Sequence, residues 1–128
     1  MLLDTCFLID LQRERKRRRP GKACAFLESW EGAPLSFSLI TYMEFLESYP
    51  DESRETADRF LRPYKRIATD AETAWQTSRI ERALRAQGHP IGDHDAWIAG
   101  TARQHGLTLL TRNSEHFRRI PGLPLAVY

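Results

Sequence analysis

The sequence has few of the features that mark several large classes of protein. It holds only two cysteines, and neither lies in a Cys-x-x-Cys or Cys/His spacing, which excludes zinc ribbons and thioredoxin-like motifs. It has no Gly-x-Gly-x-x-Gly motif, P-loop or Gly-x-Ser-x-Gly motif, so nucleotide cradling and α/β-hydrolase chemistry lack support. No apolar run approaches the roughly 20 residues that span a bilayer, and Asp4 and Asp10 interrupt the N-terminal apolar stretch. We therefore expect no membrane segment, reduced thiols and a cytoplasmic location.

The composition is that of one ordinary folded domain. The chain has 128 residues, of which 41% are hydrophobic and 28% charged, so we expect a single domain over residues 1–128. The net charge of +2 conceals an asymmetry, because residues 13–19 (RERKRRR) hold six of the 19 Lys and Arg residues. Such a run is either a phosphate-binding patch or a solvated loop.

Short apolar runs alternate with segments of helical spacing. Strands are predicted over 1–4, 35–38, 64–68, 107–110 and, at an edge, 123–127. Helices are predicted over 6–12, 23–30, Thr41 to Pro50, 51–61, Asp70 to Gln87, 93–105 and 115–119, with the basic run in a loop. This alternation favours an α/β fold, a three-layer domain with a parallel sheet covered on both faces.

Four polar residues follow predicted strands or open a predicted helix. Asp4 ends the first strand, and Glu44 and Asn113 lie just after the second and fourth. Asp95 lies in the first turn of the helix that opens at residue 93. Because open α/β sheets place their sites beyond the carboxyl ends of the strands, we expect these side chains to converge. Converging carboxylates repel one another, and a bound hard cation, Mg²⁺ or Mn²⁺, resolves the repulsion.

Two of these acids also have a purely structural interpretation. Glu44 lies three residues after Thr41 and fits a capping box, and Asp95 fits a first-turn acid favoured by the helix dipole. Asp93 is interpreted as the N-cap of its helix.

The other charged candidates are interpreted as surface residues. Asp10, Glu47 and His116 fall in this group, and His94 is the histidine nearest the expected site.

Four segments in order resemble the PIN-domain family, and within it the VapC-type toxins of bacterial toxin–antitoxin pairs. The opening LLDTCFLIDL resembles the family's first strand and its Asp-Thr start, and SLITYMEFLES resembles its Thr-x-x-Glu segment. The stretch IGDHDAWIAGTARQHGLTLLTRN resembles its IGxxDxxIAxxA block and Thr-x-Asn strand end. The tail HFRRIPGL resembles its usual ending. Two positions depart from the pattern: Asn113 is an amide where many members have a fourth acid, and Cys6 stands where Asn or Ser is common.

The resemblance implies a metal-dependent endoribonuclease that cleaves RNA with a metal-activated water. It implies that Asp4, Glu44 and Asp95 hold Mg²⁺, for which Mn²⁺ substitutes, and that Asn113 completes the catalytic set. Thr5 and Thr111 are expected to hydrogen-bond the carboxylates or the waters of the metal, and Asp93 is expected among the residues that surround the metal ligands. Contacts to the RNA backbone are expected from Arg13, Arg15, Lys16, Arg17, Arg18 and Arg19.

The resemblance further implies a homodimer, a cognate antitoxin that blocks the site, and an RNA substrate of the tRNA or rRNA class. Two alternatives stay open at the level of sequence. One is a DNA or structure-specific nuclease of the same fold, which a panel of substrates would separate. The other is a non-catalytic PIN-like binding module, in which titration with Mn²⁺ would detect no site.

Overall fold

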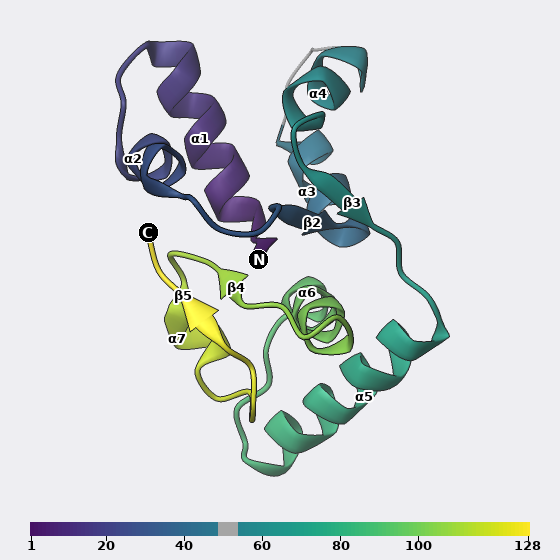
Figure 1. Cartoon of the computed structure of the whole chain (residues 1–128). Helices are drawn as coiled ribbons and strands as arrows, with labels where there is room; N and C mark the ends of the chain where they lie inside the picture. The colour runs from purple at the N-terminus through teal and green to yellow at the C-terminus, as the bar shows by residue number, and fades with distance from the viewer. Residues whose placement is uncertain (49–53) are drawn as a thin grey trace.

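The sheet is entirely parallel and has helices on both faces, as the sequence predicts (Figure 1). The structure is a computed structural model that describes residues 1–48 and 54–128. Its five strands lie in the order β3-β2-β1-β4-β5, with the predicted C-terminal strand at an edge. The strands are β1 (Leu2–Leu3), β2 (Ser36–Ser38), β3 (Lys65–Ile67), β4 (Leu109–Leu110) and β5 (Leu125–Ala126).

Two groups of helices cover the two faces of the sheet (Figure 1). One face is covered by α1 (Thr5–Arg17), α2 (Lys22–Ser29), α3 (Leu39–Glu47) and α4 (Arg54–Leu61). The other is covered by α5 (Ala71–Ala86), α6 (Asp93–Gln104) and the short α7 (Ser114–Phe117). The predicted helix stop at Pro50 and helix start at Asp51 lie outside the described residues. Within the described part of the chain, no helix is long and apolar enough to cross a membrane.

The central strands divide their side chains between two hydrophobic clusters. Leu3 and Leu110 belong to the cluster under α1–α4, whereas Leu2 and Leu109 belong to the one under α5 and α6. All four are fully buried, because successive strand residues point to opposite faces and both faces are covered. This burial fixes the carboxyl ends of β1 and β4 side by side, where the polar residues follow.

The first helix is longer than the sequence pattern predicts. The expected loop over the basic run is wrong for residues 13–17, since α1 continues to Arg17 and ends at Arg18 in the left-handed conformation. Arg and Lys are good helix formers, and cations in a last helical turn interact favourably with the helix dipole. The prediction gave weight to the missing apolar residues and too little to these two effects.

The start of α3 also differs from the prediction. Ser38, not Thr41, is the N-cap, and its hydroxyl oxygen accepts a hydrogen bond from the Thr41 backbone N–H at 2.9 Å. Glu44 therefore lies beyond the first turn and cannot close a capping box. The structural interpretation of Glu44 is wrong, which leaves its carboxylate available to the site.

A close approach of two helices positions the start of α6. Gly100 of α6 packs on α5, where an added Cβ would lie 2.2 Å from Thr77 Oγ1. The N-cap of α6 is Gly92 rather than Asp93, which is the first helical residue. Asp95 is consequently in the first turn, as predicted.

Candidate active site

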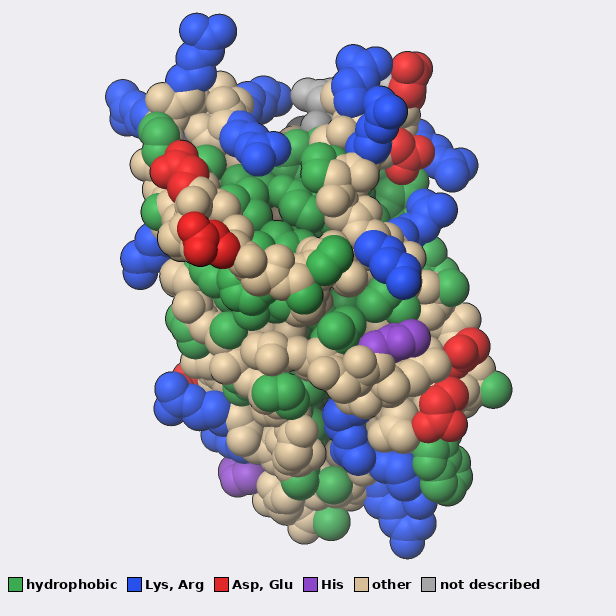
Figure 2. Space-filling view, in the orientation of Figure 1, with side chains coloured by type: hydrophobic (Ala, Val, Ile, Leu, Met, Phe, Trp, Pro, Cys, Tyr) green, Lys and Arg blue, Asp and Glu red, His purple; other side chains and the backbone are tan. Residues whose placement is uncertain are grey.

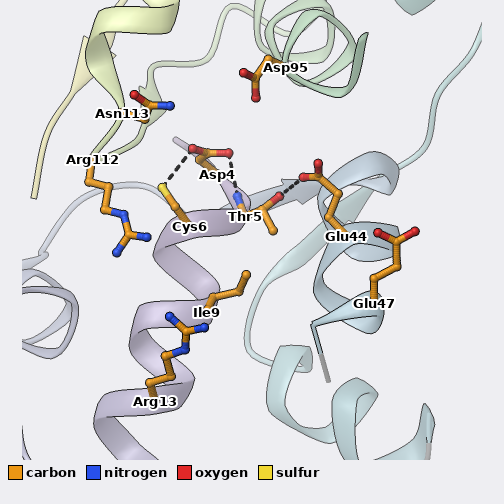
Figure 3. A pocket seen from close by; sticks show the side chains of 10 residues that line it. All are labelled: Asp4, Thr5, Cys6, Ile9, Arg13, Glu44, Glu47, Asp95, Arg112 and Asn113. Atoms are coloured by element: carbon orange, nitrogen blue, oxygen red, sulfur yellow. Dashed lines mark hydrogen bonds between the residues drawn. The ribbon is translucent and has the colours of Figure 1, made fainter. Parts of the chain in front are cut away.

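A cleft of about 630 Å³ opens at the carboxyl ends of β1 and β4 (Figure 3). Segments far apart in the sequence contribute to it. Its lining residues are Asp4, Thr5, Cys6, Ile9, Arg13, Glu44, Glu47, Asp95, Arg112 and Asn113. All four residues of the predicted catalytic set thus line one cleft, and Thr5 lines it with them.

Asp4 forms the floor of the cleft and is the most enclosed of its acids, with 5% of its surface exposed. It is the N-cap of α1, and its Oδ1 accepts a hydrogen bond from the Thr5 N–H at 2.7 Å. Its Oδ2 accepts hydrogen bonds from the Thr111 hydroxyl at 2.7 Å and the Cys6 thiol at 3.0 Å. Burial, followed by the charge of Asp4, raises the pKa of the Cys6 thiol. Cys6 therefore stays a neutral donor that helps to fix the carboxylate.

Glu44 comes from α3 and is held from two sides. Its Oε2 accepts a hydrogen bond from the Thr5 hydroxyl (Figure 3). Its Oε1 lies 3.0 Å from His94 Nδ1. Thr5 thus joins two acids, since its N–H contacts Asp4 and its hydroxyl contacts Glu44. The supporting contacts of Thr5 and Thr111 with carboxylates are present as expected, and His94 lies beside the site.

Asp95 faces Asp4 and Glu44 from α6. Burial raises its pKa above the ordinary value, and the charges of Asp4 and Glu44 raise it further. The contact of its Oδ2 with His116 Nδ1, at 3.2 Å, acts in the opposite direction. The same His116 nitrogen lies 2.9 Å from Asn113 Nδ2. The three carboxylates of the cleft therefore repel one another, and a bound cation would relieve this repulsion.

Several residues at the site were not anticipated from the sequence. His116 and Glu47 are exposed, as expected, but His116 also contacts Asp95 and Glu47 also lines the cleft. Arg112 also lines it and forms an ion pair with Asp10. Arg112 directly follows Thr111 at the end of β4, and this position was the signal that could have revealed it.

The remaining predicted site residues lie outside this cleft. Asp93 is exposed and lines a neighbouring hollow with Glu44, His94 and Asp95. Of the basic run, Arg13 alone lines the cleft. The other predicted RNA contacts, Arg15, Lys16, Arg17, Arg18 and Arg19, are exposed farther along α1 and beyond its end.

An all-oxygen set of three carboxylates suits Mg²⁺ or Mn²⁺ better than zinc. Among the described residues, no three acidic, histidine or cysteine side chains are close enough to enclose an ion directly. Mg²⁺ commonly keeps several waters and uses one or two carboxylates directly. The donor chemistry and the mutual repulsion of the acids therefore fit such an ion, with part of its contacts made through water.

Fold and site together define a small α/β protein with an acidic cleft at the carboxyl edge of a parallel sheet. The chain belongs to the PIN-domain family, whose model matches residues 1–123. It is 31% identical over 116 residues to the tRNA(fMet)-specific endonuclease VapC of Shigella flexneri, covering 87% of this chain and 79% of that protein. It is 30% identical over 129 residues to ribonuclease VapC1 of Methanocaldococcus jannaschii, covering 100% of this chain and 86% of that protein.

Solved structures of toxin–antitoxin proteins share the fold. VapBC-1 from nontypeable Haemophilus influenzae matches with a TM-score of 0.80 and 25% identity, covering 98% of this chain and 96% of that chain. A toxin–antitoxin complex from Klebsiella pneumoniae matches with a TM-score of 0.73 and 31% identity, covering 95% and 93% of the two chains. These similarities agree with the VapC-type resemblance found in the sequence.

Proposed function

We propose that this chain is a metal-dependent endoribonuclease, the toxin of a VapBC-like toxin–antitoxin pair. The observation that carries the proposal is the meeting of Asp4, Glu44 and Asp95, from three distant segments, in one cleft. The names of the relatives support it, since the proteins from Shigella flexneri and Methanocaldococcus jannaschii are called endonuclease and ribonuclease.

Asp4, Glu44 and Asp95 would hold Mg²⁺, or Mn²⁺ in its place. When bound, such an ion lowers the pKa of a water molecule and neutralises charge on the scissile phosphate. The chain's own task is then to hold three carboxylates in a fixed arrangement. Thr111, Cys6 and the Thr5 N–H orient Asp4, while the Thr5 hydroxyl and His94 orient Glu44.

The cleft separates the two signs of charge. Figure 3 shows the carboxylates of Asp4, Glu44 and Asp95 toward one end and the guanidinium groups of Arg13 and Arg112 toward the other. A guanidinium group matches the geometry of a phosphate and donates two hydrogen bonds to it. Arg13 and Arg112 would thus hold the phosphates that flank the scissile one. Asn113 would orient the substrate or a water through its amide.

The partners follow from the same proposal. The neighbours from Haemophilus influenzae and Klebsiella pneumoniae are described as VapBC-1 and as a toxin–antitoxin complex, so a cognate antitoxin is expected to block this cleft. The substrate is RNA of the tRNA or rRNA class, in line with the name of the Shigella flexneri relative. A homodimer remains a prediction of the family resemblance.

The test compares two conservative substitutions, Glu44→Gln in the cleft and Glu28→Gln on the exposed surface of α2. Cleavage of labelled RNA is followed with Mg²⁺ and with EDTA. We expect wild type and Glu28→Gln to cleave RNA only with the metal, and Glu44→Gln to lose cleavage while keeping its fold by circular dichroism. Cleavage of DNA but not RNA would identify the alternative nuclease, and full activity of Glu44→Gln or activity in EDTA would refute the mechanism.

A further inference from the structure

Residues 13–17 of the basic run belong to helix α1, and their side chains lie on different faces of the helix. Side chains three or four residues apart lie on one helical face, and Asp10, Arg13, Glu14 and Arg17 of α1 have this spacing. Together with Arg19, which lies beyond the end of the helix, they line a second cavity of about 290 Å³. Arg13 also lines the catalytic cleft, so the second cavity adjoins the first.

Both acids in the second cavity are already engaged by other groups. Asp10 Oδ2 accepts hydrogen bonds from the Arg112 guanidinium and, at 2.8 Å, from the Tyr128 hydroxyl. Glu14 accepts hydrogen bonds from three backbone N–H groups at the start of α2. The donors are Gly21 at 2.9 Å, Ala23 at 3.2 Å and Cys24 at 2.8 Å.

The arginines of this cavity have no comparable partners. Within the described chain, Arg13, Arg17 and Arg19 form no ion pair, and all three are exposed. Figure 2 shows Lys and Arg side chains projecting at the end of the molecule where α1 ends in Figure 1. The cavity therefore presents a surplus of positive charge to solvent.

Arg15 belongs to the same run but points elsewhere. Its guanidinium lies over the ring of Phe60 in α4, 5.7 Å from the ring centroid. Arg15 does not line either cavity beside α1. It provides a control of the same residue type, two positions from Arg13 and Arg17.

We propose that Arg13, Arg17 and Arg19 form a basic track that binds the phosphodiester backbone of RNA beyond the cleft. The inference rests on the proposed nuclease function, because it assumes that the scissile phosphate lies at the carboxylates. Thirteen helical residues separate Asp4 from Arg17, about 20 Å at 1.5 Å per residue. Arg17 and Arg19 then contact phosphates that only a strand of several nucleotides can place there.

The position of the track favours a nucleic acid over an acidic protein segment. A phosphodiester chain must already enter the adjoining cleft if cleavage occurs there, and it continues directly onto Arg13. An acidic peptide that covered the track and extended into the cleft would meet Asp4, Glu44 and Asp95, whose charges would repel it.

The experiment measures binding without cleavage, by fluorescence anisotropy of labelled RNA in EDTA. The variants are Arg17→Gln/Arg19→Gln in the track and Arg15→Gln as the matched control, with oligonucleotides of about 3 and about 12 nucleotides. At about 3.4 Å per nucleotide, the spacing along one strand of a duplex, these lengths cover about 10 Å and about 41 Å, on either side of the span of about 20 Å along α1. We expect the double variant to bind the long RNA more weakly than wild type and the short RNA equally well.

The salt dependence of RNA affinity measures how many phosphate contacts are lost. Removing two phosphate contacts to a single strand should reduce the slope of log affinity against log salt by about 1.4, whereas Arg15→Gln should leave it unchanged. Wild-type binding by the double variant, an equal loss in Arg15→Gln, or a loss independent of RNA length would overturn the track. The track would also be overturned if polyglutamate binding depended on Arg17 and Arg19 and RNA binding did not.

The two proposals can fail separately. A protein that binds long RNA through Arg17 and Arg19 but does not cleave it with Mg²⁺ refutes the nuclease and keeps the track. A protein that cleaves RNA but binds it independently of these arginines refutes the track alone. A parallel series with DNA of the same lengths separates the two kinds of phosphodiester.

Discussion

The acidic cleft and the basic track are opposite in charge, yet helix α1 contributes residues to both. Asp4 lies at the N-cap of α1, and Arg17 lies in its last turn. The helix dipole stabilises anions at the first end and cations at the second. The separation of charge that an RNA-cleaving site needs is therefore consistent with the electrostatics of α1 itself.

Helix dipoles also affect the three acids of the cleft differently. Asp4 and Asp95 lie at the starts of α1 and α6, where the dipole favours them. Glu44 lies in the second half of α3, where the dipole disfavours it. Its charge is instead supported by the Thr5 hydroxyl and His94. Glu44 consequently depends on side-chain partners more than the other two acids do.

Burial is the second difference between the regions. Asp4 is nearly enclosed and makes three hydrogen bonds, whereas Arg13, Arg17 and Arg19 are exposed. Changes in the cleft should therefore affect the chemical step steeply, and changes in the track should affect RNA affinity mildly.

The largest effect is expected from Asp4→Asn. Asn is as good an N-cap as Asp, so the helix is retained while one metal-binding charge is lost. A loss of several kcal/mol of transition-state stabilisation corresponds to a rate about 100-fold to 1000-fold lower. RNA cleavage under single-turnover conditions measures it. Asp4→Ala should be equally inactive and also less stable by about 1 kcal/mol, because the cap is lost.

The matched control is Asp70→Asn, the same substitution at the N-cap of α5. Asp70 does not line the cleft, so this variant should cleave RNA at the wild-type rate. If Asp4→Asn also did so, the assignment of Asp4 would be wrong and the contrast between the two regions would disappear.

A smaller effect is expected from Asp95→Asn, which should raise the stability of the metal-free protein, whereas Asp4→Ala should lower it. The folded state raises the pKa of Asp95 above the ordinary value of 3.8, so the folded protein binds more protons there than the unfolded one. That carboxyl therefore reduces stability progressively as pH rises from 3.8 through its folded pKa. In EDTA at pH 7, Asp95→Asn should be more stable than wild type by about 0.5–2 kcal/mol, and below pH 3.8 the difference should vanish.

Mn²⁺ should reverse this order. An ion that binds only the folded state stabilises it by about 2.7 kcal/mol at 100 times its Kd, and Asp95→Asn should lose most of this gain. Thermal unfolding with EDTA and with Mn²⁺ measures both effects. An Asp95→Asn protein that is less stable than wild type in EDTA would mean that the acids do not repel one another as proposed.

The fold and the three acids could be predicted because strong, local signals mark them. Buried Leu pairs in β1 and β4 require covered faces, and polar residues at strand ends converge by the geometry of a parallel sheet. Asp4 was found in this way, whereas Asp95 was found in the first turn of the helix that opens at residue 93. Their positions depend on the order of elements along the chain, which the sequence displays directly.

The contacts that were missed depend on pairing between distant elements. His116 reaches Asp95 only because α7 packs beside the start of α6, and Arg112 is placed by its ion pair with Asp10. The sequence shows that Arg112 follows a strand end, but no local pattern encodes its ion pair with Asp10 or the contact of His116 with Asp95. The error at α3 was of another kind, since Ser38 and Thr41 are both good N-caps and only the end of β2 decides between them.

The smallest effect is expected from Glu14→Gln, at a residue that lines the cavity of the basic track. Burial alone would raise the pKa of Glu14, but hydrogen bonds from the backbone N–H groups of Cys24, Ala23 and Gly21 lower it overall. A lowered folded pKa contributes stability above the ordinary pKa, and this contribution is lost as pH falls through the folded value. Glu14→Gln should thus be less stable at pH 7 by about 1 kcal/mol, as for a lost helix cap.

Urea denaturation at pH 7 and at pH 3 measures this stability difference, which should shrink at the lower pH. The same variant removes a negative charge from beside Arg13 and Arg17, so its affinity for long RNA should equal or exceed that of wild type. Glu14→Gln therefore distinguishes the fold of the track from its binding of RNA, because the variant should be less stable while its affinity for RNA does not fall. A variant that lost RNA affinity together with stability would indicate that the start of α2, and not the arginine charge, forms the RNA-binding surface.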